Sequence, residues 1–101
     1  MILEVDGQGI VTLSDPDTFT AFHVRASDSD LDRIVAALGE GAEKAKEDHV
    51  WVPIVRLHAL GGRHGGAGWR EGCDGMIAYA KSKGWVDEER DLVLAHVESG
   101  D

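Results

Sequence analysis

The sequence predicts an α+β fold in a single domain over residues 1–101, with helices covering an N-terminal antiparallel sheet. The first 26 residues hold short apolar runs separated by turn-forming glycine, proline and aspartate, which is typical of strands. Apolar residues then recur at helical spacing from Leu31 to Leu38. The same spacing returns in the last third of the chain, where it predicts a C-terminal helical pair. Together these patterns predict three or four strands covered by three or four helices.

The N-terminal strands begin with a β-hairpin over residues 2–14, whose turn is Asp6-Gly7-Gln8-Gly9. Its two glycines supply the positive φ angles that short hairpin turns need. A second turn contains Pro16, and a third strand is predicted from Thr18 to Arg25. Alternation would place Phe22 and Val24 on one side of this strand and His23 on the other. The three strands predict an antiparallel meander with one face to be covered.

A helix over residues 31–38 is the first predicted cover, because Leu31, Ile34, Val35 and Leu38 fall at i, i+3, i+4 and i+7. Ser27 or Ser29 can cap its N-terminus. Gly39 and Gly41 each weaken a continuing helix by roughly 1 kcal/mol relative to alanine. The helix therefore either ends near Leu38 or continues weakly to Lys46, and we favour an end or a kink at the glycines.

The middle of the chain predicts a strand from His49 to Val52, followed by a short helix from Pro53 to Leu60. Proline is well suited to the first position of a helix. Gly61 is expected to end this helix. Residues 61–68, GGRHGGAG, contain five glycines in eight positions and have the composition of a flexible connector.

The C-terminal helical pair is predicted from residues 69–98. The inner face of the first helix carries Cys73, Met76, Ile77 and Ala80 at helical spacing. Gly84 is placed to end this helix, and Asp87 to cap the second. The second helix carries Glu88, Glu89, Asp91 and Glu98 against the single Arg90. It would repel DNA, so the pair is not expected to act as a DNA-binding helix-turn-helix.

The composition limits the partners. The formal net charge is −9, which disfavours contact with nucleic acid or an anionic membrane. The charge is uneven, with a net of −7 over residues 1–48 and +3 over residues 54–86. Cys73 is the only cysteine, so no intramolecular disulfide can form. The first residues lack a signal-peptide pattern, and no apolar run approaches the ~20 residues of a membrane helix. We therefore expect a cytoplasmic protein.

The Gly61–Gly68 segment is the candidate ligand site. Glycine frees backbone N–H groups to approach a ligand, and the following helix N-terminus favours an anion. Four side chains can add bonds to a phosphate or carboxylate: Arg56, Arg63, His64 and Arg70. The segment is neither a Walker A motif nor a dinucleotide fingerprint. The competing interpretation, a surface linker without a ligand, is the one that we favour.

Other groups of reactive side chains predict no metal site and no catalytic site. Four side chains are of types that bind zinc: His58, His64, Cys73 and Asp74. Their spacing reproduces no paired-ligand motif, so no metal or cofactor is expected. Nothing places a histidine beside Cys73, so no catalytic residue is predicted. The three tryptophans either complete the core or form a binding surface, and Trp85 is expected to lock the two C-terminal helices together.

Three segments, MIAY at 76–79, SKGWVDE at 82–88 and AHVE at 95–98, resemble small uncharacterised bacterial proteins of high-GC genomes. The resemblance implies a small cytoplasmic α+β domain and no transferable activity. We therefore expect an interaction or regulatory module without catalytic activity, which binds a protein partner or a second copy of itself. The alternative is a small-anion-binding protein or minor enzyme built on the Gly61–Gly68 segment.

Overall fold

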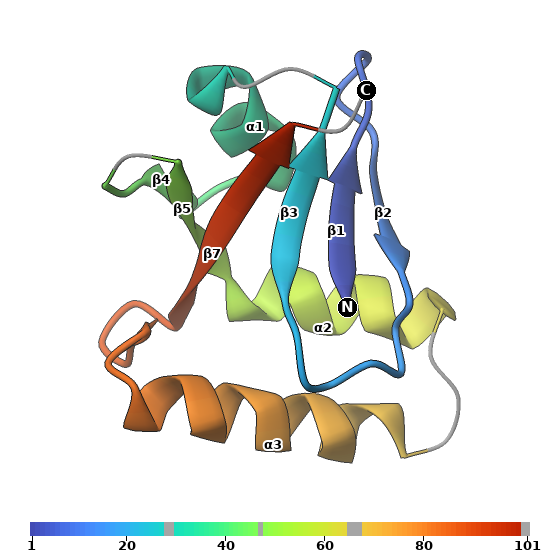
Figure 1. Cartoon of the computed structure of the whole chain (residues 1–101), viewed down its shortest axis with the longest axis vertical. Helices are drawn as coiled ribbons and strands as arrows, with labels where there is room; N and C mark the ends of the chain where they lie inside the picture. Colours follow the sequence, from blue (N-terminus) through green and yellow to red (C-terminus); the bar gives the residue numbers. More distant parts are fainter. Residues whose placement is uncertain (28–29, 47, 65–67, 100–101) are drawn as a thin grey trace.

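The structure is a computed structural model that describes residues 1–27, 30–46, 48–64 and 68–99. Its elements follow in the order β1 (Ile2–Val5), β2 (Val11–Ser14), β3 (His23–Ala26), α1 (Leu31–Leu38), β4 (Glu43–Lys44), β5 (His49–Pro53), α2 (Ile54–His64), α3 (Trp69–Ser82), β6 (Val86–Asp87) and β7 (Leu92–Ser99). Within these residues, seven strands form one mixed sheet in the order β2-β1-β3-β7-β5-β4, and β6 pairs with β7 beside this path. Figure 1 shows α1 and α2 behind the sheet and α3 below it.

The predicted fold class is wrong in its architecture. The sheet is not an N-terminal antiparallel unit, because β7, the last element of the chain, lies between β3 and β5. The hairpin of β1 and β2 is confirmed, with Ile2 opposite Ser14. However, β3 runs parallel to β1, with Ile2 opposite His23, so no meander forms. Residues 15–22 carry the chain below the sheet to the end where β1 starts, and the predicted third strand begins only at His23 (Figure 1).

The predicted final helix is also wrong, since residues 92–99 form β7. Val93, Ala95 and Val97 are buried, whereas His96 and Glu98 are exposed, which is the two-residue period of a strand. Val93 and Val97 are four residues apart, a spacing that places two side chains on one face of a helix and equally on one face of a strand. The apolar spacing therefore could not separate the two structures.

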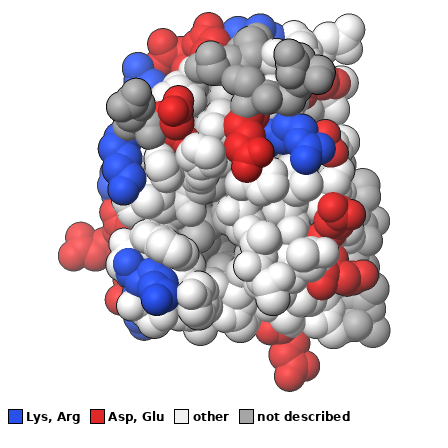
Figure 2. Space-filling view, in the orientation of Figure 1, with Lys and Arg blue, Asp and Glu red and all other residues white. Residues whose placement is uncertain are grey.

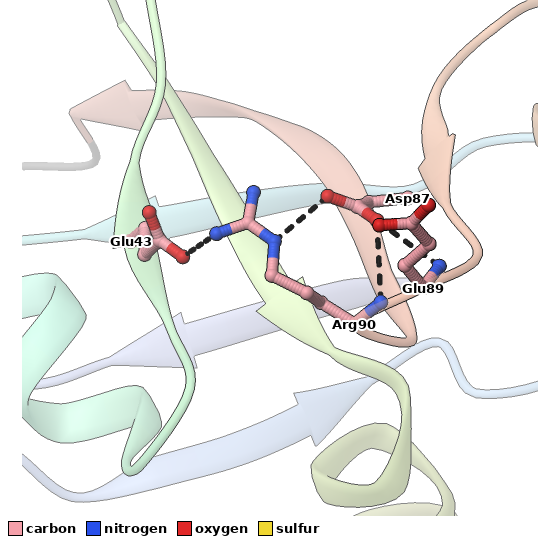
Figure 3. Close-up of polar contacts among 4 residues, drawn as sticks. All are labelled: Glu43, Asp87, Glu89 and Arg90. Atoms are coloured by element: carbon pink, nitrogen blue, oxygen red, sulfur yellow. Dashed lines mark hydrogen bonds and ion pairs between the residues drawn. The ribbon is translucent and has the colours of Figure 1, made fainter.

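The turn between β6 and β7 explains the capping pattern at Asp87. The Asp87 Oδ1 accepts hydrogen bonds from the N–H groups of Glu89 and Arg90 at 3.1 and 3.2 Å, as a helix cap would. The chain then reverses at Asp91, whose φ is +53°. Arg90 donates from Nε to Asp87 Oδ2 at 2.8 Å and from Nη1 to Glu43 of β4. Figure 3 shows this guanidinium bridging the turn to the edge of the sheet.

The core lies between the sheet and the helices α1 and α2. The α1 helix is confirmed and ends at Leu38, because Gly39 follows with a φ of +99°. Asp30, rather than Ser27, caps it by accepting from the N–H groups of Asp32 and Arg33; Ser29 lies outside the described residues. The largest fully buried side chains are Met1, Leu3, Val24, Ile34, Leu38, Val50, Val52, Leu57, Cys73, Leu92 and Val93.

The α2 helix does not end at Gly61. It continues through Gly61 and Gly62 to His64, so residues 61–64 are helical rather than part of a connector, and residues 65–67 lie outside the described part of the chain. The indole of Trp69 packs directly on the backbone of Gly61, where an added Cβ would lie 2.0 Å from Trp69 Cη2. Trp69 Nε1 also donates to the Pro16 carbonyl at 2.8 Å. Trp69 therefore joins α2, α3 and the segment before β3.

Candidate functional site

An apolar groove lies where the open face of the sheet meets α3. Six side chains line it, and we call it the aromatic groove: Phe19, Phe22, Met76, Tyr79, Trp85 and Leu94. They come from the segment before β3, from α3, from the turn before β6 and from β7. Figure 2 shows a largely uncharged area with a recess on this side of the molecule, while charged side chains gather around its periphery.

The α3 helix supplies one wall because it has two apolar faces. Trp69, Cys73 and Ala80 point into the core and are buried. Gly72, Gly75, Met76 and Tyr79 line the groove at the same helical spacing. Gly72 admits the ring of Phe19, since an added Cβ there would lie 2.4 Å from Phe19 Cε2.

The segment before β3 is held by the amino group of Met1. This group donates hydrogen bonds to the carbonyls of Thr18 and Ala21, each at 2.8 Å. Phe19 and Phe22 project from this segment into the groove. Phe22 was expected to face one side of a strand with Val24, but the strand starts one residue later.

Trp85 and Tyr79 form the exposed part of the groove. Their ring centroids are 6.4 Å apart at an interplanar angle of 69°, which is an edge-to-face arrangement. Trp85 is anchored through its backbone, since its N–H donates to the Ala80 carbonyl at 2.9 Å and its carbonyl accepts from Leu94 N–H at 2.8 Å. The side chains nevertheless remain 43% and 60% exposed, respectively. Trp85 therefore does not lock two helices together; it presents an aromatic surface between α3 and β7.

Two pockets adjoin within this region and share a wall of Phe22, Trp85 and Leu94. One is apolar, with a volume of about 90 Å³. The other has a volume of about 290 Å³ and is additionally lined by Lys46, His49 and His96. Although the chain carries 19 acidic residues, none lines either pocket among the residues that the structure describes. Sequence reasoning missed this site, because its residues are spread from position 19 to position 96.

Three histidines lie side by side on the open face of the sheet. The strand register places His96 of β7 opposite both His23 of β3 and His49 of β5. The rings of His49 and His96 are 5.2 Å apart. Glu98 Oε2 lies 3.7 Å from His23 Nε2 and 4.0 Å from His96 Nδ1. No group of three or more histidine, cysteine or carboxylate side chains in the described ranges is arranged to hold a metal ion.

The four predicted ligand residues lie on α2 and α3. Arg56 is in the first turn of α2, and its Nε is buried without a hydrogen-bond partner in the described structure. Arg63 and His64 end α2, and their side chains lie outside the described part of the molecule. Arg70, in the first turn of α3, has its Nε 3.4 Å from Asp74 Oδ1. In the described structure Arg70 therefore contacts the Asp74 carboxylate, and no described contact joins Arg70 to Arg56.

Some of the residues that were considered for a zinc site or a reactive thiolate lie close together in the structure. His58 Nε2 lies 3.3 Å from Asp74 Oδ1. Burial and the Arg70 guanidinium lower the pKa of His58, and Asp74 opposes them. Cys73 is fully buried, and its burial together with Asp74 raises the pKa of the thiol to about 11 against a smaller opposing effect of Arg70. A buried, protonated thiol is a poor nucleophile and a poor metal ligand.

No family model matches this chain, and no curated protein or solved structure matches it either. The resemblance to bacterial proteins of high-GC genomes therefore stays a prediction. None of the helices in the described residues is long and apolar enough to cross a membrane.

Proposed function

We propose that this chain is a non-enzymatic binding module of the cytoplasm that docks an apolar segment of a partner protein in the aromatic groove. The observation that carries the proposal is the exposure of Tyr79 and Trp85 on a continuous apolar surface. Contiguous exposed apolar surface marks interaction sites, and tyrosine and tryptophan are enriched among the residues that dominate binding energy.

The groove combines a small pocket with a more open recess, a shape that suits an extended protein segment. The apolar pocket has a volume of about 90 Å³, below the ~300–1,000 Å³ that is typical of small-molecule sites, and the recess beside it has about 570 Å³. The small pocket accommodates a side chain, and the more open surface beside it, lined by Phe19, Gly75 and Met76, accommodates the neighbouring residues of a segment.

A peptide display selection tests the proposal. The wild-type chain is expected to select peptides with an aromatic or large aliphatic residue. These peptides should shift the backbone amide resonances of Phe22, Met76, Tyr79 and Leu94. Tyr79→Ser and Trp85→Ser should each weaken binding about tenfold or more, as changes of central aromatic residues do.

Val55→Ser is the matched control, because Val55 is an exposed apolar residue on α2 that lines none of the pockets that form the groove. It should leave the affinity unchanged. A selection that yields no binder, or binders that Val55→Ser weakens as much as Tyr79→Ser does, would exclude the groove as the binding site.

A further inference from the structure

Three basic side chains, Lys46, His49 and His96, line the pocket beside the apolar pocket. His49 begins β5 and pairs across the sheet with His96 of β7. Lys46 lies in the turn that leads into β5, where its carbonyl accepts from the His49 N–H at 2.9 Å. The three side chains line one pocket together with Phe22, Trp85 and Leu94.

Lys46 has no carboxylate partner within the described ranges. Two of the other lysines differ in this respect: Lys44 Nζ lies 2.9 Å from Asp32 Oδ1, and Lys81 Nζ lies 2.8 Å from Glu88 Oε1. Lys83 lies instead over the Tyr79 ring, with its Nζ 5.5 Å from the ring centroid. Two described acids lie near the pocket residues in the chain: Asp48 directly precedes His49, and Glu98 follows His96 by two residues and also contacts His23. Neither lines the pocket. The Lys46 ammonium is therefore a cation beside an apolar wall that forms no ion pair with a described acid.

The net charge of −9 does not prevent an acidic group from binding here. At physiological ionic strength, charges more than about 8 Å apart are largely screened, so the local charges of the pocket decide. An acidic segment would meet Lys46 directly, whereas a basic segment would place its cation against this ammonium. Charge complementarity thus favours an acidic partner segment at a surface that lacks acids of its own.

We propose that the partner segment carries a glutamate or aspartate side chain next to its apolar anchor, and that Lys46, with His49 and His96, receives this carboxylate. This inference rests on the proposed function of the groove. The carboxylate is assigned to a side chain, rather than to a chain terminus, because the apolar pocket has open surface on both sides, towards Gly72 and towards Lys46. A segment that crosses the groove passes through the pocket rather than ending there.

The test uses the tightest peptide from the display selection, acetylated and amidated at its ends. It is expected to contain an acidic residue beside the anchor. Changing that residue to glutamine should weaken binding about tenfold, the size expected for a hydrogen bond to a charged group. Lys46→Gln should cause the same loss, and combining the two changes should cause little more, because both remove one interaction.

Lys44→Gln is the matched control, because Lys44 lies two residues away and is paired with Asp32; it should change the affinity less than twofold. Thermal melting verifies that each variant is folded. Selected peptides that bind the groove without an acidic residue, or that Lys46→Gln leaves unaffected, would overturn the carboxylate site while the groove stands. Binding that requires a free C-terminal carboxylate would assign the site to a chain terminus instead. If no peptide is selected, both proposals fail.

Discussion

Two glycines in this chain are required by close contact with aromatic rings rather than by a turn. Gly61 of α2 lies under the indole of Trp69, and Gly72 of α3 lies under the ring of Phe19. A side chain at either position would occupy space that the ring already fills. The contact at Gly61 joins α2 to α3, and the contact at Gly72 positions one wall of the aromatic groove. At this scale, the absence of a Cβ contributes to both the fold and the proposed site.

Gly61→Ala should destabilise the protein, although alanine is the better helix former by roughly 1 kcal/mol. The new methyl group would overlap the Trp69 indole, and overpacking of this kind costs roughly 1–3 kcal/mol or more. Gly62→Ala is the matched control, because nothing lies within 4 Å of an added Cβ there. It should leave stability unchanged or raise it. Urea titration measures both variants, and a Gly61→Ala protein as stable as the Gly62→Ala protein would contradict the packing of Trp69.

Cys73 should make the free energy of unfolding fall between about pH 9 and pH 11. The unfolded thiol ionises near pH 9.0, whereas the folded thiol keeps its proton until about 11. In this window the unfolded state binds fewer protons, so stability decreases as the pH rises, by roughly 2 kcal/mol at pH 10.5. Cys73→Ala lacks this contribution. Urea titrations at pH 8.5 and 10.5 measure the difference, and equal losses in both proteins would show that the thiol is not shielded.

At the scale of elements, β7 organises the sheet. It pairs with β3 on one side, with β5 on the other and with β6 at its start. A strand in this position has its backbone groups paired on both sides and one of its faces in the core. The other face, with Leu94 and His96, is directed to the groove and the basic pocket. The last element of the chain thus connects the core to the proposed site.

Amide hydrogen exchange should be slowest in β7 and its neighbours. Amides from Val93 to Val97 should exchange at least tenfold more slowly than those of β2, an edge strand with a single neighbour, because exchange in the centre of a sheet requires more extensive opening. Exchange in β7 as fast as in β2 would contradict the central position of this strand.

At the scale of the whole molecule, the distribution of charge separates the groove from the rest of the surface. The chain carries 19 acidic against 10 basic residues, yet the described lining of the groove and its adjoining pocket contains no acid. This arrangement leaves one apolar surface of low negative charge on a strongly acidic protein. A net charge of −9 disfavours non-specific association between copies of the chain.

Duplex DNA should not bind measurably at physiological salt. The acidic turn at 87–91 and the net charge of −9 oppose a polyanion, and binding to DNA depends largely on contacts of cations with phosphates. Fluorescence anisotropy with labelled duplexes at about 0.15 M salt tests this expectation. A submicromolar complex that weakens as the salt concentration rises would contradict it.

The sequence alone determined the features that depend on neighbouring residues. The hairpin of β1 and β2 and the end of α1 at Gly39 both depend on contacts within a few residues of the chain. The same holds for the hydrogen bonds that Asp87 accepts, although they close a turn and not the predicted helix. On α3 the prediction placed Cys73 and Ala80 correctly in the core, whereas Met76 lines the groove. The expectation that the chain does not bind nucleic acid also rests on composition, and it stays a prediction. Turn, cap and charge patterns depend on residues that are close in the sequence, so they can be predicted without knowledge of the tertiary structure.

Only the tertiary structure decided which strands meet and where a site forms. Val93 and Val97 fit a helix and a strand equally well, and β7 is a strand because β3 and β5, distant in the sequence, pair with it on both sides. Gly61 lies inside α2, with the indole of Trp69 packed on its backbone. The aromatic groove likewise combines Phe19, Met76, Trp85 and Leu94. These outcomes depend on contacts between residues far apart in the chain, whose free energies outweigh the local preferences that the sequence displays.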